Sequence, residues 1–283
     1  MIIKKVLLAS DFSEASLQLI DRISEFKPLG LEEVILVHVV DVGIPMTTVN
    51  VFQTYDEEIL KKQKESIEVL DLKVTVMVPL GFPASEIVRI AEEEKVSLIT
   101  IASHGKGIIQ RLFLGSTTTD VIRTSTVPVL VEKRSSVDKD SLVMKKSLFK
   151  KVLLPIDFSE YSQRVLDEIK DLPQLVEELI LISVIEKAYN DQELQKAMTK
   201  NEARLNQIKQ DFEGLGFRTR IMIYQGSAST SIIDVAEEED VSLIVMATRG
   251  EGLIKELLLG STAHAVARRS SKPLLLIPLS RIQ

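Results

Sequence analysis

The chain lacks several features that mark common classes of protein. It has no cysteine, which excludes disulfides and thiolate sites for metals or redox chemistry. Its three histidines, His38, His104 and His264, are widely separated, which argues against a zinc centre. No long stretch of Lys and Arg is present, and the net charge is −6, so nucleic acid is not an expected partner.

Long apolar runs are also missing. None approaches the roughly 20 residues that a membrane-spanning helix needs. The run before Asp11 is too short for the core of a signal peptide and is typical of a buried strand. We therefore expect a soluble, cytoplasmic protein that does not bind membranes.

The composition is that of an ordinary globular protein. Apolar residues make up 45% of the 283 positions and charged residues 27%. At roughly 150 residues per domain, this length suggests two domains, each large enough to bury a core.

The sequence is duplicated. KKVLLASDFSE at Lys4–Glu14 recurs as KKVLLPIDFSE at Lys150–Glu160, and 11 of 23 positions are identical between Gly81–Ser103 and Gly226–Thr248. The period is far longer than a solenoid unit, so each copy is a whole domain. We expect a first domain over residues 1–133, a polar linker over 134–147 and a second domain over 148–283.

Each copy alternates short apolar runs with helical patterns. The predicted strands of the first copy are Val6–Ala9, Val34–Val40, Lys73–Val78, Ser97–Ser103 and Pro128–Glu132. Those of the second copy are Val152–Pro155, Glu178–Ile185, Arg218–Tyr224, Ser242–Ala247 and Pro273–Ile277. The predicted helices of the first copy are one capped by Ser13, with Leu17, Ile20 and Ile23 on one face, and then Tyr55–Leu70, Pro83–Glu94 and Ser116–Thr124. The segment Asp41–Tyr55 has no helical period and predicts a mobile loop over the ligand site.

Continuously apolar strands separated by helices predict an α/β fold with a parallel sheet covered on both faces. Right-handed crossovers favour two doubly wound domains, each with five strands in the order 3-2-1-4-5. The first and fourth strands then lie side by side, and ligands bind beyond their carboxyl ends. The fifth strand of each copy is an apolar edge, so we expect the copies to pair through these strands and chains to form a homodimer.

A glycine-containing segment follows the fourth predicted strand of each copy. It reads ASHGKGIIQRLFLGST from Ala102 and ATRGEGLIKELLLGST from Ala247. The Gly-Ser pairs near its end open the next helix, where N–H groups, the helix dipole and a hydroxyl favour phosphate. Nearby cations that would complement phosphate are His104, Lys106, Arg111, Arg249 and Lys255. The alternative is that the glycines only turn the chain and the serines only cap a helix.

These segments resemble the motif G-x2-G-x9-G-[ST] of nucleotide-binding universal stress proteins, and the resemblance covers nearly the whole chain. Gly105 and Gly250, each followed after nine residues by a Gly-Ser pair, match the motif, whereas Ala102 and Ala247 replace its first glycine. The resemblance implies a tandem of domains with the adenine nucleotide alpha-hydrolase-like fold. The implied ligand is ATP, ADP or AMP, with or without Mg²⁺.

The resemblance also implies a set of nucleotide contacts, with Asp11 and Asp157 beside the nucleoside. In the first copy the contacts are Ser10, Asp11, Val39, Val40, Ala102, Ser103, His104, Gly105, Gly107, Arg111, Gly115, Ser116 and Thr117. In the second copy they are Ile156, Asp157, Val184, Ile185, Ala247, Thr248, Arg249, Gly250, Gly252, Gly260, Ser261 and Thr262. The valines and isoleucine after the second strand would flank the adenine. No catalytic or metal-ligating residue is expected.

Simpler roles stay open for some of these residues. Asp11 and Asp157 precede Phe-Ser, and either side chain could cap the following helix instead. His38 lies in an apolar strand and is expected to be a core histidine. Arg249 stands at the position of His104 in the other copy, so no shared chemistry depends on a histidine.

The motifs favour a binding protein over an enzyme. Neither the G-x4-G-K-[ST] loop of P-loop NTPases nor the G-x-S-x-G motif of α/β-hydrolases is present. We expect a non-catalytic adenine-nucleotide sensor or regulator in the stress response, whose occupancy changes its partner contacts. A slow Mg²⁺-dependent ATP hydrolase and a ligand-free structural or chaperone-like protein remain alternatives. Because Lys106 is matched by Glu251 and His104 by Arg249, we expect the two sites to differ in affinity.

Overall fold

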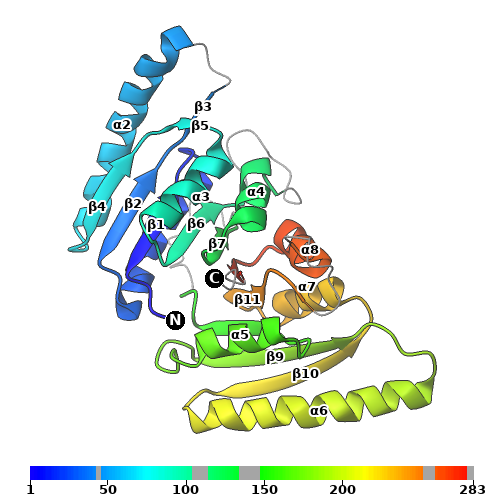
Figure 1. Ribbon diagram of the computed structural model, residues 1–283. Coiled ribbons are helices and arrows are strands. Elements are labelled where there is room, and N and C mark those ends of the chain that lie inside the picture. Colours follow the sequence, from blue (N-terminus) through cyan, green and yellow to red (C-terminus); the bar gives the residue numbers. More distant parts are fainter. Residues whose placement is uncertain (43–45, 104–113, 134–146, 251–258, 279–283) are drawn as a thin grey trace. The chain divides into compact units, whose positions relative to one another are not determined.

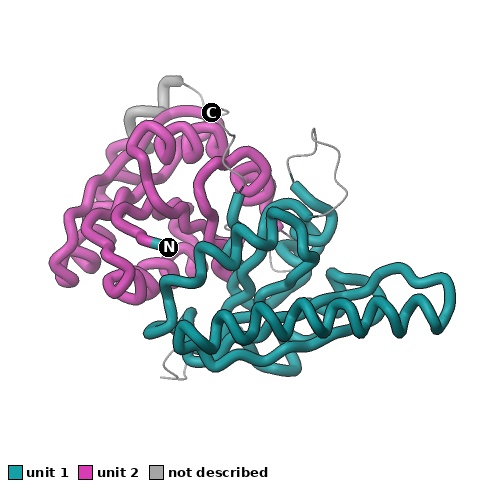
Figure 2. The backbone as a smooth tube through the Cα atoms, turned by 60° about the horizontal axis from the view of Figure 1, so that its bottom comes forward, with its two compact units in different colours: residues 1, 135–279 teal, residues 2–134, 280–283 magenta. Residues whose placement is uncertain are grey.

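The computed structural model describes residues 1–42, 46–103, 114–133, 147–250 and 259–278, with the side chains of 46–52 left undescribed (Figure 1). The chain forms two compact units, essentially residues 2–134 and 135–279 (Figure 2). Apart from Ser147, the predicted linker 134–147 lies outside the described residues.

The first unit alternates strands and helices. Its elements are β1 (Lys5–Ala9), α1 (Glu14–Arg22), the 3-10 helix η1 (Ile23–Leu29), β2 (Glu33–Val37), β3 (Val40–Asp41), α2 (Met46–Glu68), β4 (Lys73–Met77), β5 (Leu80–Gly81), α3 (Pro83–Glu93), β6 (Leu98–Ala102), α4 (Ser116–Thr124) and β7 (Val129–Glu132). Its main sheet is parallel, in the order β4-β2-β1-β6-β7 (Figure 1). The short strands β3 and β5 pair separately, beyond the carboxyl ends of β2 and β4.

The second unit repeats this arrangement. Its elements are β8 (Lys151–Pro155), α5 (Glu160–Ile169), β9 (Glu178–Ile185), α6 (Asp191–Gly214), β10 (Thr219–Gln225), α7 (Ala228–Glu238), β11 (Leu243–Ala247), α8 (Ser261–Arg269) and β12 (Leu274–Ile277). Its strands are also parallel, in the order β10-β9-β8-β11-β12. The predicted order 3-2-1-4-5 is therefore confirmed in both units.

The strands form where the apolar runs predict them. In β2, every residue after Glu33 is buried, as it must be in a sheet covered on both faces. Helices α1 and α2 contact each other, and so do α3 and α4. Apolar side chains from the strands and from the inner faces of these helices make the core of each unit.

Helix starts follow the capping residues. Ser13 caps α1, and its hydroxyl accepts a hydrogen bond from the N–H of Ser16 at 3.2 Å, as predicted. The predicted face of α1 is wrong at Leu17, which is 45% exposed. The helix instead turns the small residues Ala15 and Ser16 inward, which allows it to pack closely.

The predicted loop over Asp41–Tyr55 is also wrong. Helix α2 begins at Met46, nine residues before the predicted start at Tyr55. The β-branched residues of this stretch have low helix propensity, but propensity is weaker than tertiary context. No proline or glycine follows Pro45 before the helix ends, so nothing in the sequence interrupts it.

Candidate functional site

The first and fourth strands of each unit lie side by side, and their carboxyl ends form the edge where the sequence predicts a site. In the first unit, β1 pairs with β6, and Ser10 and Ser103 follow these two strands. Their backbone N–H groups continue the ladder, to the carbonyls of Val37 at 2.8 Å and Glu132 at 2.9 Å. Both serines are buried at the floor of this edge.

A tight turn with the sequence Asp-Phe-Ser leads away from the first strand of each unit. In the first unit, Oδ1 of Asp11 accepts a hydrogen bond from the N–H of Ser13 at 3.1 Å. In the second, Oδ1 of Asp157 accepts one from the N–H of Ser159 at 3.0 Å. The serine is the helix cap in both units, so the aspartate is not the N-cap.

The phenylalanine of each turn has a left-handed backbone. Its φ is 62° at Phe12 and 61° at Phe158. For a residue with a bulky side chain this conformation costs on the order of 1–2 kcal/mol. Because the strain occurs in both copies, the position of the preceding aspartate is set by the fold at some energetic cost.

The start of the last helix is tied to the same edge. Gly115 caps α4, and its N–H donates to the carbonyl of Ser103 at 2.8 Å. Gly260 caps α8, and its N–H donates to the carbonyl of Thr248 at 2.8 Å. The first turns of α4 and α8 therefore begin beside the ends of β6 and β11, where their N–H groups and the helix dipole favour an anion.

The alanines that replace the first glycine of the motif are compatible with the backbone. Ala102 is the last residue of β6 and pairs with Glu132, and Ala247 ends β11 opposite Ile277. Neither residue is among those with positive φ. A glycine is therefore not needed at these positions for conformational reasons.

A third segment approaches the turn in the second unit. A Cβ atom at Gly250 would lie 2.6 Å from Oδ2 of Asp157, closer than real Cβ contacts allow. Glycine thus lets the chain after β11 pass directly against the aspartate of the turn. The structure brings together these two predicted residues from segments 93 positions apart.

The remaining predicted contacts fall into three groups. Val40 is buried at the start of β3, Ile185 is buried at the end of β9, and their neighbours Val39 and Val184 are half-buried at the same edges. Three contacts follow the ends of β8 and β11: Ile156, Thr248 and Arg249. Four others open α4 and α8: Ser116, Thr117, Ser261 and Thr262. The predicted contacts His104, Gly105, Gly107, Arg111 and Gly252 lie outside the described residues.

Sequence analysis missed two buried polar side chains of α2 that reach this edge. Asp56 and Gln63 share the buried face of the helix with Leu60 and Ile67. The hydroxyl of Ser10 donates to Oε1 of Gln63 at 3.3 Å. The signal was available as two polar residues seven positions apart in the apolar stripe of an amphipathic helix.

His38 follows β2 directly and is half-buried, so the prediction of a core histidine within the strand is wrong, although both ring nitrogens have partners. Its Nδ1 lies 2.8 Å from the carbonyl oxygen of Ser10, and its Nε2 lies 3.4 Å from Oδ2 of Asp56. The partner of Nε2, Asp56, is one of the two residues of α2 that the sequence did not predict to lie at this edge.

A buried lysine follows the last strand of the first unit. Lys133 comes directly after Glu132, whose carbonyl accepts the N–H of Ser103. Burial lowers the pKa of Lys133 to about 8.

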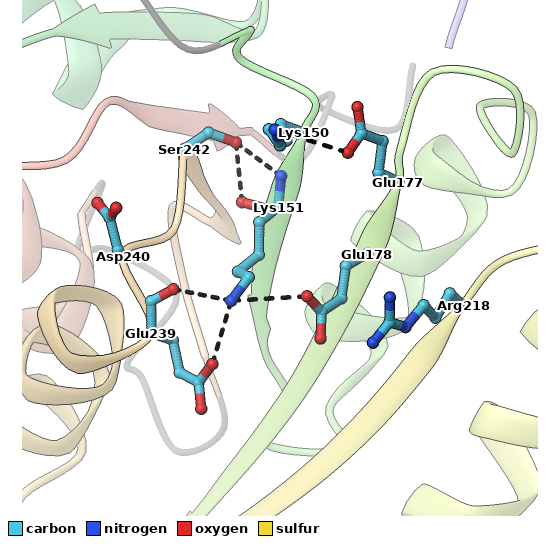
Figure 3. A pocket seen from close by; sticks show the side chains of 8 residues that line it. All are labelled: Lys150, Lys151, Glu177, Glu178, Arg218, Glu239, Asp240 and Ser242. Atoms are coloured by element: carbon cyan, nitrogen blue, oxygen red, sulfur yellow. Dashed lines mark hydrogen bonds and ion pairs between the residues drawn. The ribbon is translucent and has the colours of Figure 1, made fainter.

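A pocket of about 280 Å³ lies at the opposite edge of the second sheet, at the amino ends of β8, β9 and β10 (Figure 3). Its lining residues are Lys150, Lys151, Glu177, Glu178, Arg218, Glu239, Asp240 and Ser242. Nζ of Lys151 lies between two carboxylates, 3.5 Å from Glu178 and 3.2 Å from Glu239. Arg220 also pairs with both carboxylates, so two cations balance two anions at the centre and leave little field for a charged ligand.

Glu178 and Glu239 of this pocket are held in their charged form. Burial alone would raise the pKa of Glu178, but the hydrogen bond and charge of Arg220 outweigh it, so its pKa lies below the ordinary value. The hydrogen bond from Arg220 likewise lowers the pKa of Glu239 against the opposing effect of burial. We interpret this cluster as a structural ion-pair network.

Within the described ranges, no group of three or more His, Asp and Glu side chains is arranged to hold a metal ion. In the same part of the chain, no helix combines the length and apolar character needed to cross a membrane.

Comparison with known proteins agrees with this architecture. The family model described as "Universal stress protein family" matches the chain twice, over residues 3–133 and 148–278. The chain therefore belongs to the universal stress protein family, as a tandem of two family domains.

Individual proteins and solved structures are similar to this chain. Universal stress protein MJ0577 of Methanocaldococcus jannaschii is 34% identical over 157 residues, which is 47% of this chain and 96% of the relative. The crystal structure of a universal stress protein from Archaeoglobus fulgidus covers 97% of this chain and 98% of its own, at 27% identity and a TM-score of 0.78. Another universal stress protein was solved in complex with cAMP; it covers 48% of this chain and all of its own, at 21% identity and a TM-score of 0.37.

Proposed function

We propose that each copy binds one adenine nucleotide and that the protein acts as a nucleotide-dependent regulator in the stress response. The observation that carries this proposal is the duplicated edge at which the Asp-Phe-Ser turn follows the first strand and the last helix begins beside the end of the neighbouring fourth strand. Gly115 and Gly260 tie these helices to the carboxyl ends of β6 and β11 by hydrogen bonds of 2.8 Å. This is the position where doubly wound sheets bind their ligands.

The residues at this edge fit a nucleotide in three respects. The first turns of α4 and α8 offer backbone N–H groups to phosphates, with hydroxyls at Ser116 and Ser261. Asp11 and Asp157 would lie beside the nucleoside. The close approach of Gly250 to Asp157 supports a compact cradle, which a larger residue at this glycine would disturb.

A binding role is better supported than catalysis. Phosphoryl transfer usually requires metal-holding carboxylates and a group that orients water. Among the described residues no cluster suited to a resident metal is found, so Mg²⁺ would arrive with the phosphates. Occupancy would then act by favouring one conformation of the protein over another.

The first test is to identify bound nucleotide directly. The purified protein is denatured and the released small molecules are measured by mass spectrometry, and the stripped protein is titrated with ATP, ADP and AMP by calorimetry. We expect up to two adenine nucleotides per chain and no rapid turnover with Mg²⁺. Steady release of phosphate in step with binding would favour the hydrolase alternative. Absence of both released nucleotide and binding heat at millimolar ligand would favour the ligand-free scaffold.

Pairing of the two copies through their last strands, a homodimer of chains and a cytoplasmic location remain predictions from the sequence. Analytical ultracentrifugation of the full chain tests the homodimer. Substitution of a lysine for Leu130 in β7 or Leu275 in β12, followed by limited proteolysis, tests the pairing, because a charge would disfavour a paired apolar edge.

A further inference from the structure

His38 joins three elements at the proposed site of the first copy. Its Nδ1 lies 2.8 Å from the carbonyl oxygen of Ser10, at the end of β1. Its Nε2 lies 3.4 Å from Oδ2 of Asp56, on the buried face of α2. Its ring stacks on the ring of Phe12, with centroids 4.2 Å apart. His38 therefore contacts the residues on both sides of Asp11.

The protonation state of His38 decides whether each ring nitrogen faces a group of complementary hydrogen-bonding character. A carbonyl oxygen only accepts, so Nδ1 carries the proton that faces Ser10. Neutral imidazole then turns the lone pair of Nε2 toward the carboxylate of Asp56, which also only accepts. Protonated imidazole donates to both oxygens and adds an attraction between opposite charges. Imidazole ordinarily changes its charge between about pH 5 and 8.

Among the side chains that the structure describes, Asp56 is the ionisable one placed against the His38 ring. From the turn after β1, the ring meets the Ser10 carbonyl and the Phe12 ring, while Asp11 directs Oδ1 to the backbone N–H of Ser13. From β4, the carbonyl of Met77 accepts the backbone N–H of His38 at 3.1 Å. The residues of the chain around Met77, Val76 and Val78, are uncharged.

The second copy makes the same link without a group that titrates. Ser183 stands at the position of His38, and Asn201, 145 residues after Asp56, donates from its amide to the Ser183 hydroxyl at 3.2 Å. The ring of Phe158 lies under the guanidinium of Arg204 at 3.9 Å. Arginine keeps its charge throughout the physiological range. Helix α6 is therefore held to its turn equally at pH 6 and pH 8.

We propose that His38 is a positioning residue of the first nucleotide site, and that its protonation opposite Asp56 makes this site, but not the second, bind nucleotide more tightly at pH 6 than at pH 8. The proposal rests on the proposed function. Loss of the proton removes the ion pair between Nε2 and Asp56, 3.4 Å apart, which holds α2 to the turn bearing Asp11. We expect the ATP affinity of the first site to fall about fivefold from pH 6 to pH 8, beyond any change at the second site.

The test separates the two sites within the full chain. Gly260→Val leaves the first site intact, and Gly115→Val leaves the second. ATP is titrated into each variant by calorimetry at pH 6 and pH 8. The ionisation of ATP itself affects both sites, so it cancels in the ratio of their pH dependences. Equal pH dependence at the two sites would overturn the proposal while leaving the proposed function standing.

Matched variants then assign the effect to the pair. Two substitutions, His38→Ser and Asp56→Asn, are made together in the Gly260→Val chain. They reproduce the Ser183–Asn201 pair of the second copy, which this fold accommodates. Asp56→Asn alone keeps the imidazole and gives neutral Nε2 an amide donor. Both changes should abolish the excess pH dependence, with circular dichroism confirming the fold. An excess that persists in both variants would assign the effect to another group and refute the proposal.

A measurement on the ligand-free protein distinguishes failure of this proposal from failure of the proposed function. With three histidines in the chain, the imidazole nitrogen NMR signals of His38 are assigned by their loss in the His38→Ser variant. We expect the neutral form to keep its proton on Nδ1, and amides of α2 near Asp56 to exchange faster at pH 8 than base catalysis alone predicts. If the NMR signals and the amide exchange behave as expected but ATP binds neither site, then the proposed function is refuted, and the effect of His38 on nucleotide binding is refuted with it. If ATP binds and the exchange shows no excess, the proposal about His38 alone falls.

Discussion

The two copies hold the long helix after their second strand in different ways. In the first copy, α2 buries the polar side chains Asp56 and Gln63 against the site edge. In the second, isoleucines replace two of the polar partners: Ile156 stands at the position of Ser10, and Ile208 at that of Gln63. The backbone order of the two sheets is nevertheless the same.

This difference shows which features of the domain are fixed and which are free to change. The Asp-Phe-Ser turn, its left-handed phenylalanine and the glycine cap of the last helix recur at equivalent positions. The side chains beneath the turn do not. The pair His38–Asp56 is replaced by Ser183–Asn201, whose members are joined to each other by a hydrogen bond.

The largest expected effect concerns the buried leucine that α2 and α6 have at equivalent positions. Leu60 of α2 and Leu205 of α6 are equivalent and fully buried. Leu60→Ala and Leu205→Ala should each lower the free energy of unfolding by about 3 kcal/mol, measured by urea denaturation. Leu17→Ala, at an exposed position, is the control and should cost less than about 0.5 kcal/mol. A small effect from only one of the buried leucines would show that the two helices are anchored unequally.

The next effect concerns the two glycine caps. Gly115→Val and Gly260→Val keep an extended φ, −61° and −71°, which valine adopts readily, but place a branched side chain where phosphate would approach. Each should weaken ATP binding at its own copy by about 50-fold and halve the stoichiometry seen by calorimetry. We expect the site that remains in Gly115→Val and the site that remains in Gly260→Val to differ in their affinity for ATP. Identical affinities would contradict this prediction. Gly214→Ala is the control, because a Cβ there meets nothing within 4 Å.

A smaller effect compares the ion pairs at the amino edge. Glu239 pairs with both Lys151 and Arg220, whereas in the first copy Thr75 stands at the position of Arg220 and Glu94 pairs with Lys5. At pH 7, Glu239→Gln should cost about 1 kcal/mol of stability, and Glu94→Gln should cost less.

The pH dependence of this comparison has a definite sign. The pKa of Glu239 is lowered in the folded protein, chiefly by the Arg220 hydrogen bond and against burial. Its contribution is therefore complete above the ordinary carboxyl pKa and is lost as the pH falls through the lower, folded value. The gap between wild type and Glu239→Gln in urea denaturation should shrink from pH 7 to about pH 3. A gap that widens in acid would contradict the assignment.

The smallest effect tests the replaced glycines of the motif. Because neither Ala102 nor Ala247 has a positive φ, glycine should not relieve strain there. Ala102→Gly and Ala247→Gly should lower stability by about 0.5–1 kcal/mol and change ATP affinity by less than about threefold. A gain in affinity of tenfold or more would show instead that the alanine methyl crowds the ligand.

The sequence predicts the sheets well and the site edge in part. Runs such as VILV and LITIA are apolar on both faces, and a buried parallel strand is the structure that accommodates them. The Gly-Ser pairs and Ser13 are local capping signals, and they begin helices where predicted. These features depend on neighbours in the sequence.

The contacts of His38 could not be predicted in this way. They depend on which face α2 turns to the sheet, which tertiary packing decides, and the early start of α2 was itself not predicted. The joint change of residues 38 and 56 between the copies was visible in the sequence. It became meaningful only when the structure placed Nε2 of His38 beside Asp56.

The length of α2 gives this contact a mechanical consequence. Asp56 lies near the middle of the helix, and the 12 residues from there to its end at Glu68 span about 18 Å toward the opposite edge of the sheet. A small change in the tilt of the helix at Asp56 therefore becomes a larger displacement at its far end. A tilt of about 5° at Asp56 would move its far end by about 1.5 Å, similar to the helix shifts that carry signals between subunits. Gain or loss of a proton at one edge of the sheet would in this way displace the surface at the other.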